Sequence, residues 1–287
     1  MKLRRISQAA WSEQMKPMLA IVTDINIFTL NRLSISSNRG KGIIVASYVC
    51  RAVIMGLIAT AHSGATTVVA VAGSDRIVLG ADALARGSVS GSASVCKIHR
   101  ENGIFFAIVG LLWKHETAFY GEQLVGSICR ESSDIRKLTD RVGVLAREPL
   151  QTALTYSRDH DSLVYKRDYV NHTVFEVVLA GFVGDKPIIG IKSFFLDSVL
   201  GLRELDTITL PDDVGHNAVF TGEHDAINAY TENHPDWSNT PDLFGLVSHL
   251  IGLEIIDKPY TVGPPVAIVE IRAKGYQWLA PGQCPEQ

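Results

Sequence analysis

The stretch ATTVVAVAGSDRIVLGADAL, residues 65–84, decides the fold of this chain. It predicts a hairpin of two strands, residues 66–72 and 76–82, closed by a three-residue Gly-Ser-Asp turn. The predicted register places Thr66 directly across from Asp82, where opposed Cβ atoms lie roughly 4.5–5.5 Å apart. A hydroxyl at the very start of a strand, beside a carboxylate, is one half of a site that uses an N-terminal nucleophile.

A signal-like apolar segment precedes the hairpin. Residues 42–65 read GIIVASYVCRAVIMGLIATAHSGA, and the apolar run 52–61 follows Arg51. The run is shorter than the roughly 20 residues of a membrane span, but it fits the roughly 7–15 residues of a signal-peptide core. It ends in small residues at 63–65, which a signal peptidase favours. Cleavage after them would make Thr66 the new N-terminus.

Other interpretations of this region stay open. Residues 42–65 could be a buried strand or helix of the fold. The first 40–50 residues could be an upstream extension, since Met55 offers a later start. Residues 42–62 could also be an uncleaved membrane anchor. A signal peptide implies export to the periplasm or the cell exterior, and otherwise a cytoplasmic location is expected. We divide the chain into a leader, 1–65, and one domain, 66–287.

The composition supports this division. The chain has 287 residues, 46% hydrophobic and 20% charged, which is typical of a soluble globular protein with a sizeable core. Its net charge of -3 argues against nucleic acid as a partner. Residues 1–51 hold eight basic and two acidic side chains, a net of +6, so the remainder carries -9. The two parts are chemically different.

The cysteines and histidines predict no metal centre. The four cysteines have no CxxC spacing, so they indicate neither a zinc site nor a disulfide framework, while a single bridge stays open. The nine histidines show no HExxH or comparable spacing. We therefore expect no metal and no cofactor.

The remaining predicted strands and helices come in runs of one type rather than alternating strand by helix. Hairpins are predicted at 96–101 with 104–110 and at 173–181 with 187–195, helices at 114–131, 134–156, 223–231 and 242–256, and further strands at 218–221, 265–271 and 276–279. Pro149 is expected to kink or split the second helix. Segregated runs of strands and helices indicate an antiparallel α+β domain rather than a parallel βαβ fold.

Two further residues complete the predicted site. Lys97, at the start of the third strand, could hold down the pKa of a threonine amine and stabilise developing negative charge. Asp82 would then bridge Lys97 and the amine of Thr66. Gly110, at the end of the next strand, offers a backbone N–H as an oxyanion donor.

At these residues the chain resembles the proteasome family, β-type subunits in particular, and the wider N-terminal-nucleophile hydrolases. The family's TT-x-V opening, its V-L-A-A-D strand, its lysine and its later A-G correspond to residues 66–68, 78–82, 97–98 and 109–110. The resemblance is carried by residues 66–110, and the element order agrees to about residue 271.

The resemblance implies a four-layer αββα sandwich and a set of roles. Thr66 is the nucleophile, its α-amine is the general base, Asp82 and Lys97 support them, and Gly110 donates to the oxyanion. No cofactor is implied. The implied activity is that of a threonine peptidase or amide hydrolase.

Several positions depart from the family pattern. Ala65 stands where the family has glycine, which fits a separate peptidase better than self-cleavage. Leu84 replaces a common arginine. The supporting serine of the family has at best Thr221 as its counterpart, and the later aspartate and serine have Asp257 and Thr261. Activity is therefore expected, whereas assembly into a proteasome is not.

We expect a threonine-nucleophile hydrolase that acts on a peptide or amide, with a homo-oligomer left open as its assembly state. One alternative is a non-catalytic, proteasome-like structural subunit that retains its N-terminal segment. Another is a membrane-tethered interaction module held by residues 42–62. The state of the N-terminus separates the hydrolase from the other two, and detergent-dependent extraction of the full-length protein would support the membrane-tethered module.

Overall fold

The computed structural model describes residues 66–87, 91–205, 207–210 and 217–284. The leader, with its predicted signal peptide and its alternatives as anchor or extension, lies outside these residues. Within them, no helix has both the length and the apolar character needed to cross a membrane.

Two antiparallel sheets form the middle of the domain. The first contains, in order, β13 (Ala218–Gly222), β1 (Thr67–Ala72), β2 (Arg76–Asp82), β14 (Val266–Arg272) and β15 (Gly275–Ala280). The second contains β11 (Gly201–Glu204), β10 (Lys186–Asp197), β9 (His172–Val183), β6 (Ile104–Gly110) and β5 (Ile98–Glu101), with β12 (Ile208–Leu210) beside β10.

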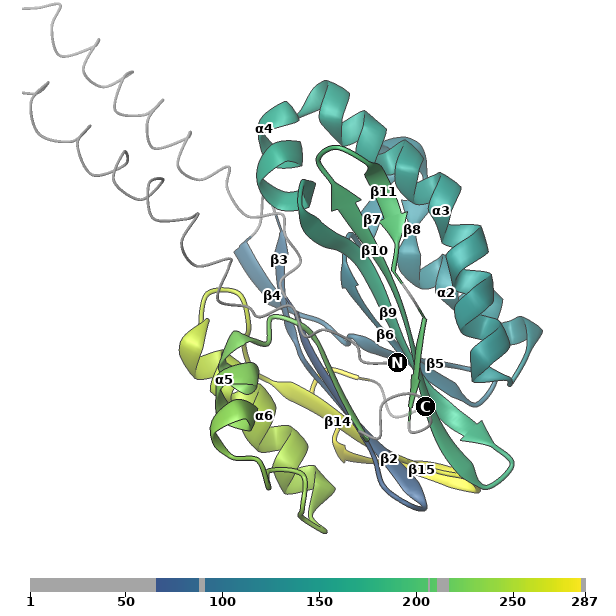
Figure 1. The fold of residues 1–287 in the computed structure, drawn as a ribbon, viewed down its shortest axis with the longest axis vertical. Coiled ribbons are helices and arrows are strands. Elements are labelled where there is room, and N and C mark those ends of the chain that lie inside the picture. Colours follow the sequence, from purple (N-terminus) through teal and green to yellow (C-terminus); the bar gives the residue numbers. More distant parts are fainter. Residues whose placement is uncertain (1–65, 88–90, 206, 211–216, 285–287) are drawn as a thin grey trace, which may run out of the picture. The chain divides into compact units, whose positions relative to one another are not determined.

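Helices cover the outer face of each sheet (Figure 1). The helices are α2 (Gly121–Glu131), α3 (Ile135–His160), α5 (Asp225–Asn233) and α6 (Leu243–Asp257). Helix α6 packs on β1, β2 and β14 with α5 beside it, whereas α2 and α3 pack on the second sheet. The order of layers is helix, sheet, sheet, helix. The predicted α+β fold with a four-layer αββα sandwich is confirmed.

The surroundings of β1 explain why residues 68–72 are apolar at every position. Val68 and Ala70 face the layer between the two sheets. Val69 and Val71 face the other way, against α6. Because successive side chains alternate between faces, a strand covered on both sides needs apolar residues throughout.

The first hairpin is confirmed, but its predicted register is wrong by one residue. Val68 pairs with Ala81, so the ladder runs on to Thr67, not Thr66, opposite Asp82. The N–H of Gly73 donates to the carbonyl of Arg76 at 2.7 Å, which closes a tighter turn than the three-residue turn expected. Thr66 lies just before the strand.

The helix predicted at 114–131 is wrong over its first seven residues. These form two short strands, β7 (Trp113–Lys114) and β8 (Phe119–Tyr120), around the 3-10 turn η2 (His115–Thr117). Pro149 lies inside α3 without splitting it, and the side chain of Asp134 caps the start of that helix. The prediction missed the small sheet of β3 (Leu84–Gly87) and β4 (Gly91–Ser94), as well as β11 and β12.

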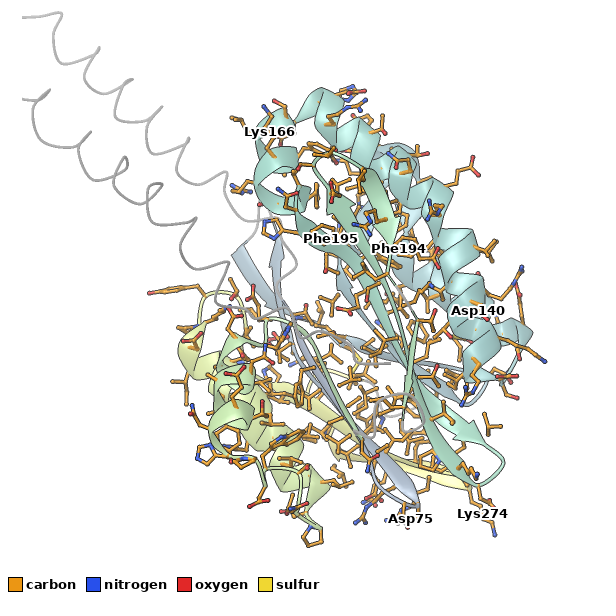
Figure 2. The ribbon with its side chains drawn as sticks, viewed as in Figure 1. Asp75, Asp140, Lys166, Phe194, Phe195 and Lys274 are labelled. Atoms are coloured by element: carbon orange, nitrogen blue, oxygen red, sulfur yellow. A yellow bond between two sulfur atoms is a disulfide. The ribbon has the colours of Figure 1, made fainter. Side chains whose placement is uncertain are left out.

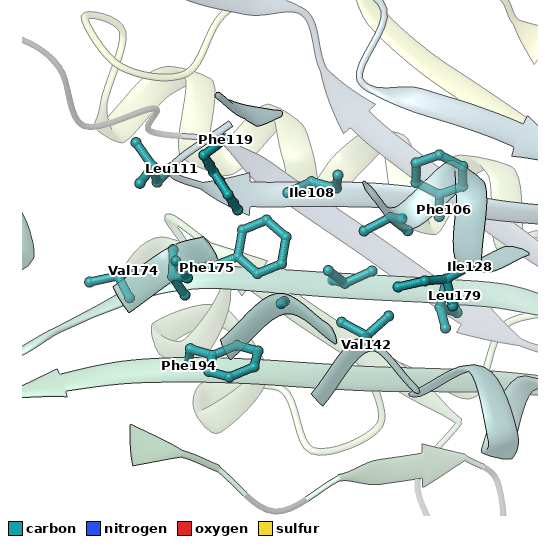
Figure 3. Packing of buried hydrophobic residues seen from close by; sticks show 14 of the residues in the cluster. Phe106, Ile108, Leu111, Phe119, Ile128, Val142, Val174, Phe175, Leu179 and Phe194 are labelled. Carbon is teal, nitrogen blue, oxygen red and sulfur yellow. The ribbon is translucent and has the colours of Figure 1, made fainter. Parts of the chain in front are cut away.

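Aromatic packing stabilises the second sheet against α2 and α3 (Figure 3). The rings of Phe119 and Phe175 meet edge to face with centroids 5.7 Å apart, and Phe194 lies beyond them. Truncation of a buried aromatic of this kind typically costs about 3–5 kcal/mol. Charged side chains such as Asp140 and Lys274 project from the outside of the domain (Figure 2). The strands that carry Gly110 and Glu176, β6 and β9, pack against the aromatic cluster.

A disulfide joins Cys96 to Cys284, across a sequence separation of 188 residues. Cys96 directly precedes Lys97, and both sulfur atoms lie at the edge of the core between the sheets. The single bridge that the sequence left open is therefore present. Among the described residues Cys129 is the free cysteine, and burial raises the pKa of its thiol to about 12.

Candidate active site

A buried ion pair lies at the centre of the candidate site. The Nζ atom of Lys97 is 2.9 Å from Oδ1 of Asp82, and the two side chains are 4% and 0% exposed. Burial lowers the pKa of Lys97, and the attraction of Asp82 opposes that shift only in part. Lys97 is therefore a lysine whose proton is held less tightly than usual.

Asp82 is fixed by hydrogen bonds at both of its oxygens. Besides Lys97, Oδ1 accepts from the backbone N–H of Thr67 at 2.9 Å. Oδ2 accepts from the N–H groups of Leu84, at 3.1 Å, and Gly263, at 3.2 Å. A carboxylate with this many donors cannot turn. Its partner on β1 is the backbone of Thr67, where the predicted register had placed Thr66.

The backbone of Thr66 is held from the other side by the end of β13. Its carbonyl accepts from the N–H of Glu223 at 2.9 Å. The hydroxyl of Thr67 donates to the carbonyl of Glu223 at 2.8 Å. Gly222 has a φ of +78°, and an ideal Cβ there would lie 1.7 Å from the Thr66 carbonyl oxygen. Glycine is therefore required at 222.

Thr66 and Gly110 line the same pocket, whose volume is about 380 Å³. Gly110 has a φ of +93°, and a Cβ there would come within 2.5 Å of the carbonyl oxygen of Val174. Thr66 is 2% exposed in the full-length chain. The structure thus brings the predicted nucleophile and the predicted oxyanion donor to one cavity.

Lys97 lines a different pocket, of about 230 Å³, with Cys96, His99 and Ile108. Burial lowers the pKa of His99, and the nearby Glu122 opposes this shift. The Asp82–Lys97 pair therefore reaches Thr66 through the peptide unit that joins Thr66 to Thr67. It does not form the wall of the Thr66 pocket.

The three predicted supporting residues have different surroundings. Thr221, on β13, is 2% exposed, and its Oγ1 has no hydrogen-bond partner among the described residues. Asp257 is exposed at the end of α6, and no described contact joins it to the Thr66 pocket. Thr261 is half-buried and donates to the carbonyl of Lys258 at 3.3 Å. The structure pairs Thr221 with Val68, two residues after Thr66, while Asp257 stays apart.

Five residues that hold Thr66 and Asp82 were not predicted as site residues. They act through their backbones, and they are Thr67, Leu84, Gly222, Glu223 and Gly263. Gly222 could have been recognised as a glycine that directly follows the predicted strand 218–221, where a turn of the chain favours glycine. Backbone donors otherwise leave little trace in a sequence, because any residue but proline supplies an N–H.

No metal centre is present among the described residues, since no cluster of three or more histidine, cysteine, aspartate or glutamate side chains has suitable geometry. Some of the charged groups near the pocket are paired with one another. Lys258 lies 2.5 Å from carboxylate oxygens of both Glu223 and Asp225. Burial alone would lower the pKa of Lys258, but these two hydrogen bonds raise it.

No family model matches the chain, and no curated protein sequence matches it. A search of solved structures finds the (Gly-1) mutant of Anbu from Hyphomicrobium sp. strain MC1. That match has 12% identity and a TM-score of 0.43, and it covers 75% of this chain and 86% of the other. The similarity is too low to transfer residues or activity. The description of the site therefore rests on this chain's own geometry.

Proposed function

We propose that this protein is a threonine-nucleophile peptidase or amide hydrolase that becomes active when Thr66 is exposed as an N-terminus. One observation carries the proposal. Thr66 shares a pocket with Gly110, while its peptide unit is fixed to the buried Asp82–Lys97 pair. A nucleophile, a backbone donor and a tuned lysine are the parts that such chemistry needs.

In the proposed reaction, Oγ of Thr66 attacks the substrate carbonyl and the free α-amine accepts its proton. The N–H of Gly110 donates to the oxyanion. The protonated α-amine then passes its proton to the leaving amine of the substrate, and expulsion of that leaving group gives an acyl-enzyme that water hydrolyses. The positive charge of Lys97 stabilises the negative charge that develops nearby. The hydroxyl of Thr221, unpartnered among the described residues, is available to the free amine.

Thr66 is a better nucleophile candidate than Thr67. The Thr67 hydroxyl already donates to Glu223, and its backbone N–H is bound to Asp82. Thr67 is fully buried and does not line the pocket. Thr66 does line it, so cleavage after Ala65 would place the amine and the hydroxyl of one residue in the cavity.

The alternative is a non-catalytic, proteasome-like structural subunit that retains residues 1–65. The burial of Thr66, which is 2% exposed in the full chain, favours it. With the preceding peptide bond intact, residue 66 carries an amide nitrogen, which is no base.

The test is mass spectrometry of the natively produced protein, followed by peptide-amide hydrolysis assays on the same material. We expect a mature chain that starts at Thr66, and a loss of about 10³-fold or more in kcat for Thr66→Ala. Thr66→Ser should retain measurable activity because it keeps a hydroxyl and an amine. An N-terminus elsewhere, or full activity of Thr66→Ala, would refute the proposal in favour of the structural subunit.

A further inference from the structure

The Thr66 pocket contains a carboxylate that the proposed reaction does not use, that of Glu176 on β9. Val178, two residues further on, faces the layer between the sheets, and side-chain alternation puts Glu176 on the same face. Val68 on β1 faces that layer from the opposite sheet, which directs Thr66 toward it as well. The two residues therefore line one cavity from two sheets.

The carboxylate of Glu176 lacks a cationic partner. The hydroxyl of Ser193, its neighbour on β10, donates to Oε1 at 2.6 Å. No lysine or arginine of the described residues forms an ion pair with it, and burial raises its pKa, against smaller opposing effects of Ser193 and His224. A largely buried carboxylate with one neutral donor has spare hydrogen-bond capacity.

The other charges in the pocket are compensated. Arg167 binds both oxygens of Asp168, at 2.5 and 2.7 Å. Glu223 is paired with Lys258 at 2.5 Å. Among the carboxylates that line the pocket, Glu176 is therefore the one without a cationic side chain bound to it.

We propose that Glu176 forms a subsite for a cationic group of the substrate, a primary ammonium or a guanidinium, beside the nucleophile Thr66. The inference rests on the proposed function and specifies its substrate class. Such a group supplies the missing counter-charge and several N–H donors, and hydrogen bonds between ions are the strong ones. At about 380 Å³ the pocket is within the range of roughly 300–1,000 Å³ found for ligand sites.

The subsite predicts a pH dependence that an ordinary glutamate would not give. Because burial raises the pKa of Glu176, its negative charge is lost at a higher pH than for an exposed glutamate. Preference for basic substrates should therefore weaken as the pH falls, and it should begin to do so at a higher pH than an exposed glutamate would give. The other titratable groups of the pocket are Arg167, Asp168, Tyr169, His172, Glu223, His224 and, in the mature chain, the α-amine of Thr66. Protonation of His172 or His224 would also repel a cationic substrate. If Glu176 is the source of the effect, His172→Asn and His224→Asn should each still lose the preference for basic substrates as the pH falls.

The test uses the mature chain beginning at Thr66 and pairs of fluorogenic peptide amides that differ in one residue, lysine or norleucine. The variable residue is placed in turn on each side of the scissile bond. At pH 8 we expect a lysine-to-norleucine ratio in kcat/KM of about 10 or more at one position, and a ratio near 1 for Glu176→Gln. Glu232→Gln, an exposed change on α5, should leave the ratio unchanged. An unchanged ratio in Glu176→Gln would refute the subsite.

Binding separates this inference from the proposed function. The same peptides are titrated into the mature Thr66→Ala variant, with and without Glu176→Gln. If no peptide is cleaved by the Thr66 chain but the lysine peptide still binds about 10-fold tighter, and only with Glu176 present, the subsite stands and the hydrolase fails. Equal affinities for both peptides refute the subsite. Should Glu176→Gln not fold, a lysine-to-norleucine ratio near 1 for the unmodified protein at pH 8, on both sides of the scissile bond, does the same.

Discussion

The carbonyl oxygen of Thr66 occupies the space where a side chain on residue 222 would begin. An ideal Cβ on Gly222 would lie 1.7 Å from that oxygen and 2.8 Å from its carbon. Because both partners are backbone, neither can turn away. The end of β13 therefore fixes where Thr66 lies, and glycine at 222 is a condition of the site.

Gly222→Ala should abolish activity and strongly destabilise the domain. The positive φ alone costs an alanine about 1–2 kcal/mol, and the collision with Thr66 adds to it, so we expect about 3 kcal/mol or more in urea unfolding. Gly184→Ala is the matched control, because Gly184 has a φ of +63° and nothing within 4 Å of its ideal Cβ. Equal losses in the two variants would mean that the contact with Thr66 contributes nothing.

Breaking the buried Asp82–Lys97 pair should cost far more than breaking an exposed one. Lys97→Met leaves a buried carboxylate without its cation, so we expect a loss of about 3–5 kcal/mol in the free energy of unfolding. Arg141→Ala, which removes a half-exposed partner of Glu131, should cost about 1 kcal/mol or less. Denaturant unfolding of both variants makes the comparison. Similar costs would show that Lys97 is not buried as described.

The lowered pKa of Lys97 predicts how activity and stability respond to alkaline pH. The folded chain releases this proton at a lower pH than the unfolded chain, whose lysine keeps its ordinary value of 10.5. Between those two pH values the unfolded state binds more protons than the folded state. The free energy of unfolding therefore increases with pH over this range as far as Lys97 is concerned. Activity should fall over the same range, because the positive charge is lost.

NMR of ¹³C-labelled lysine side chains, with Lys97→Met to assign the signal, follows this proton directly. We expect its midpoint below 10.5, and a fall of kcat with the same midpoint. A midpoint at or above 10.5 would contradict the account of the pair.

The sequence predicted the fold well because its strongest signals are local. Unbroken apolar runs identified β1, β2, β9 and β10, and the Asn102-Gly103 step identified the β5–β6 turn. The helix predicted at 114–131 began seven residues too early. The apolar residues of 114–131 have helix-compatible spacing, yet residues 115–117 form a turn and residues 119–120 a short strand.

The site was predicted in its side chains but not in its backbone. Asp82 and Lys97 are paired, and Thr66 and Gly110 share a pocket, as their spacing indicated. The one-residue error in the hairpin assigned the Asp82 contact to Thr66 instead of Thr67. A turn one residue shorter shifts every pairing along the ladder, and the sequence does not distinguish the two turns.

The Cys96–Cys284 bridge should stabilise the domain and hold Lys97 in place. A bridge across 188 residues restricts the unfolded chain strongly, and removal of a native disulfide typically costs about 2–5 kcal/mol. We expect a loss of that size for Cys96→Ala with Cys284→Ala, and a lower kcat because residue 96 precedes Lys97. Cys129→Ala, which removes a buried free thiol, should leave kcat unchanged and cost about 1 kcal/mol. Urea unfolding and peptide hydrolysis measure both effects.

Thiol counting tests whether the bridge forms. On the unfolded chain from Thr66 onward it should find one free thiol before reduction and three after it, and three before reduction would show that the bridge does not form.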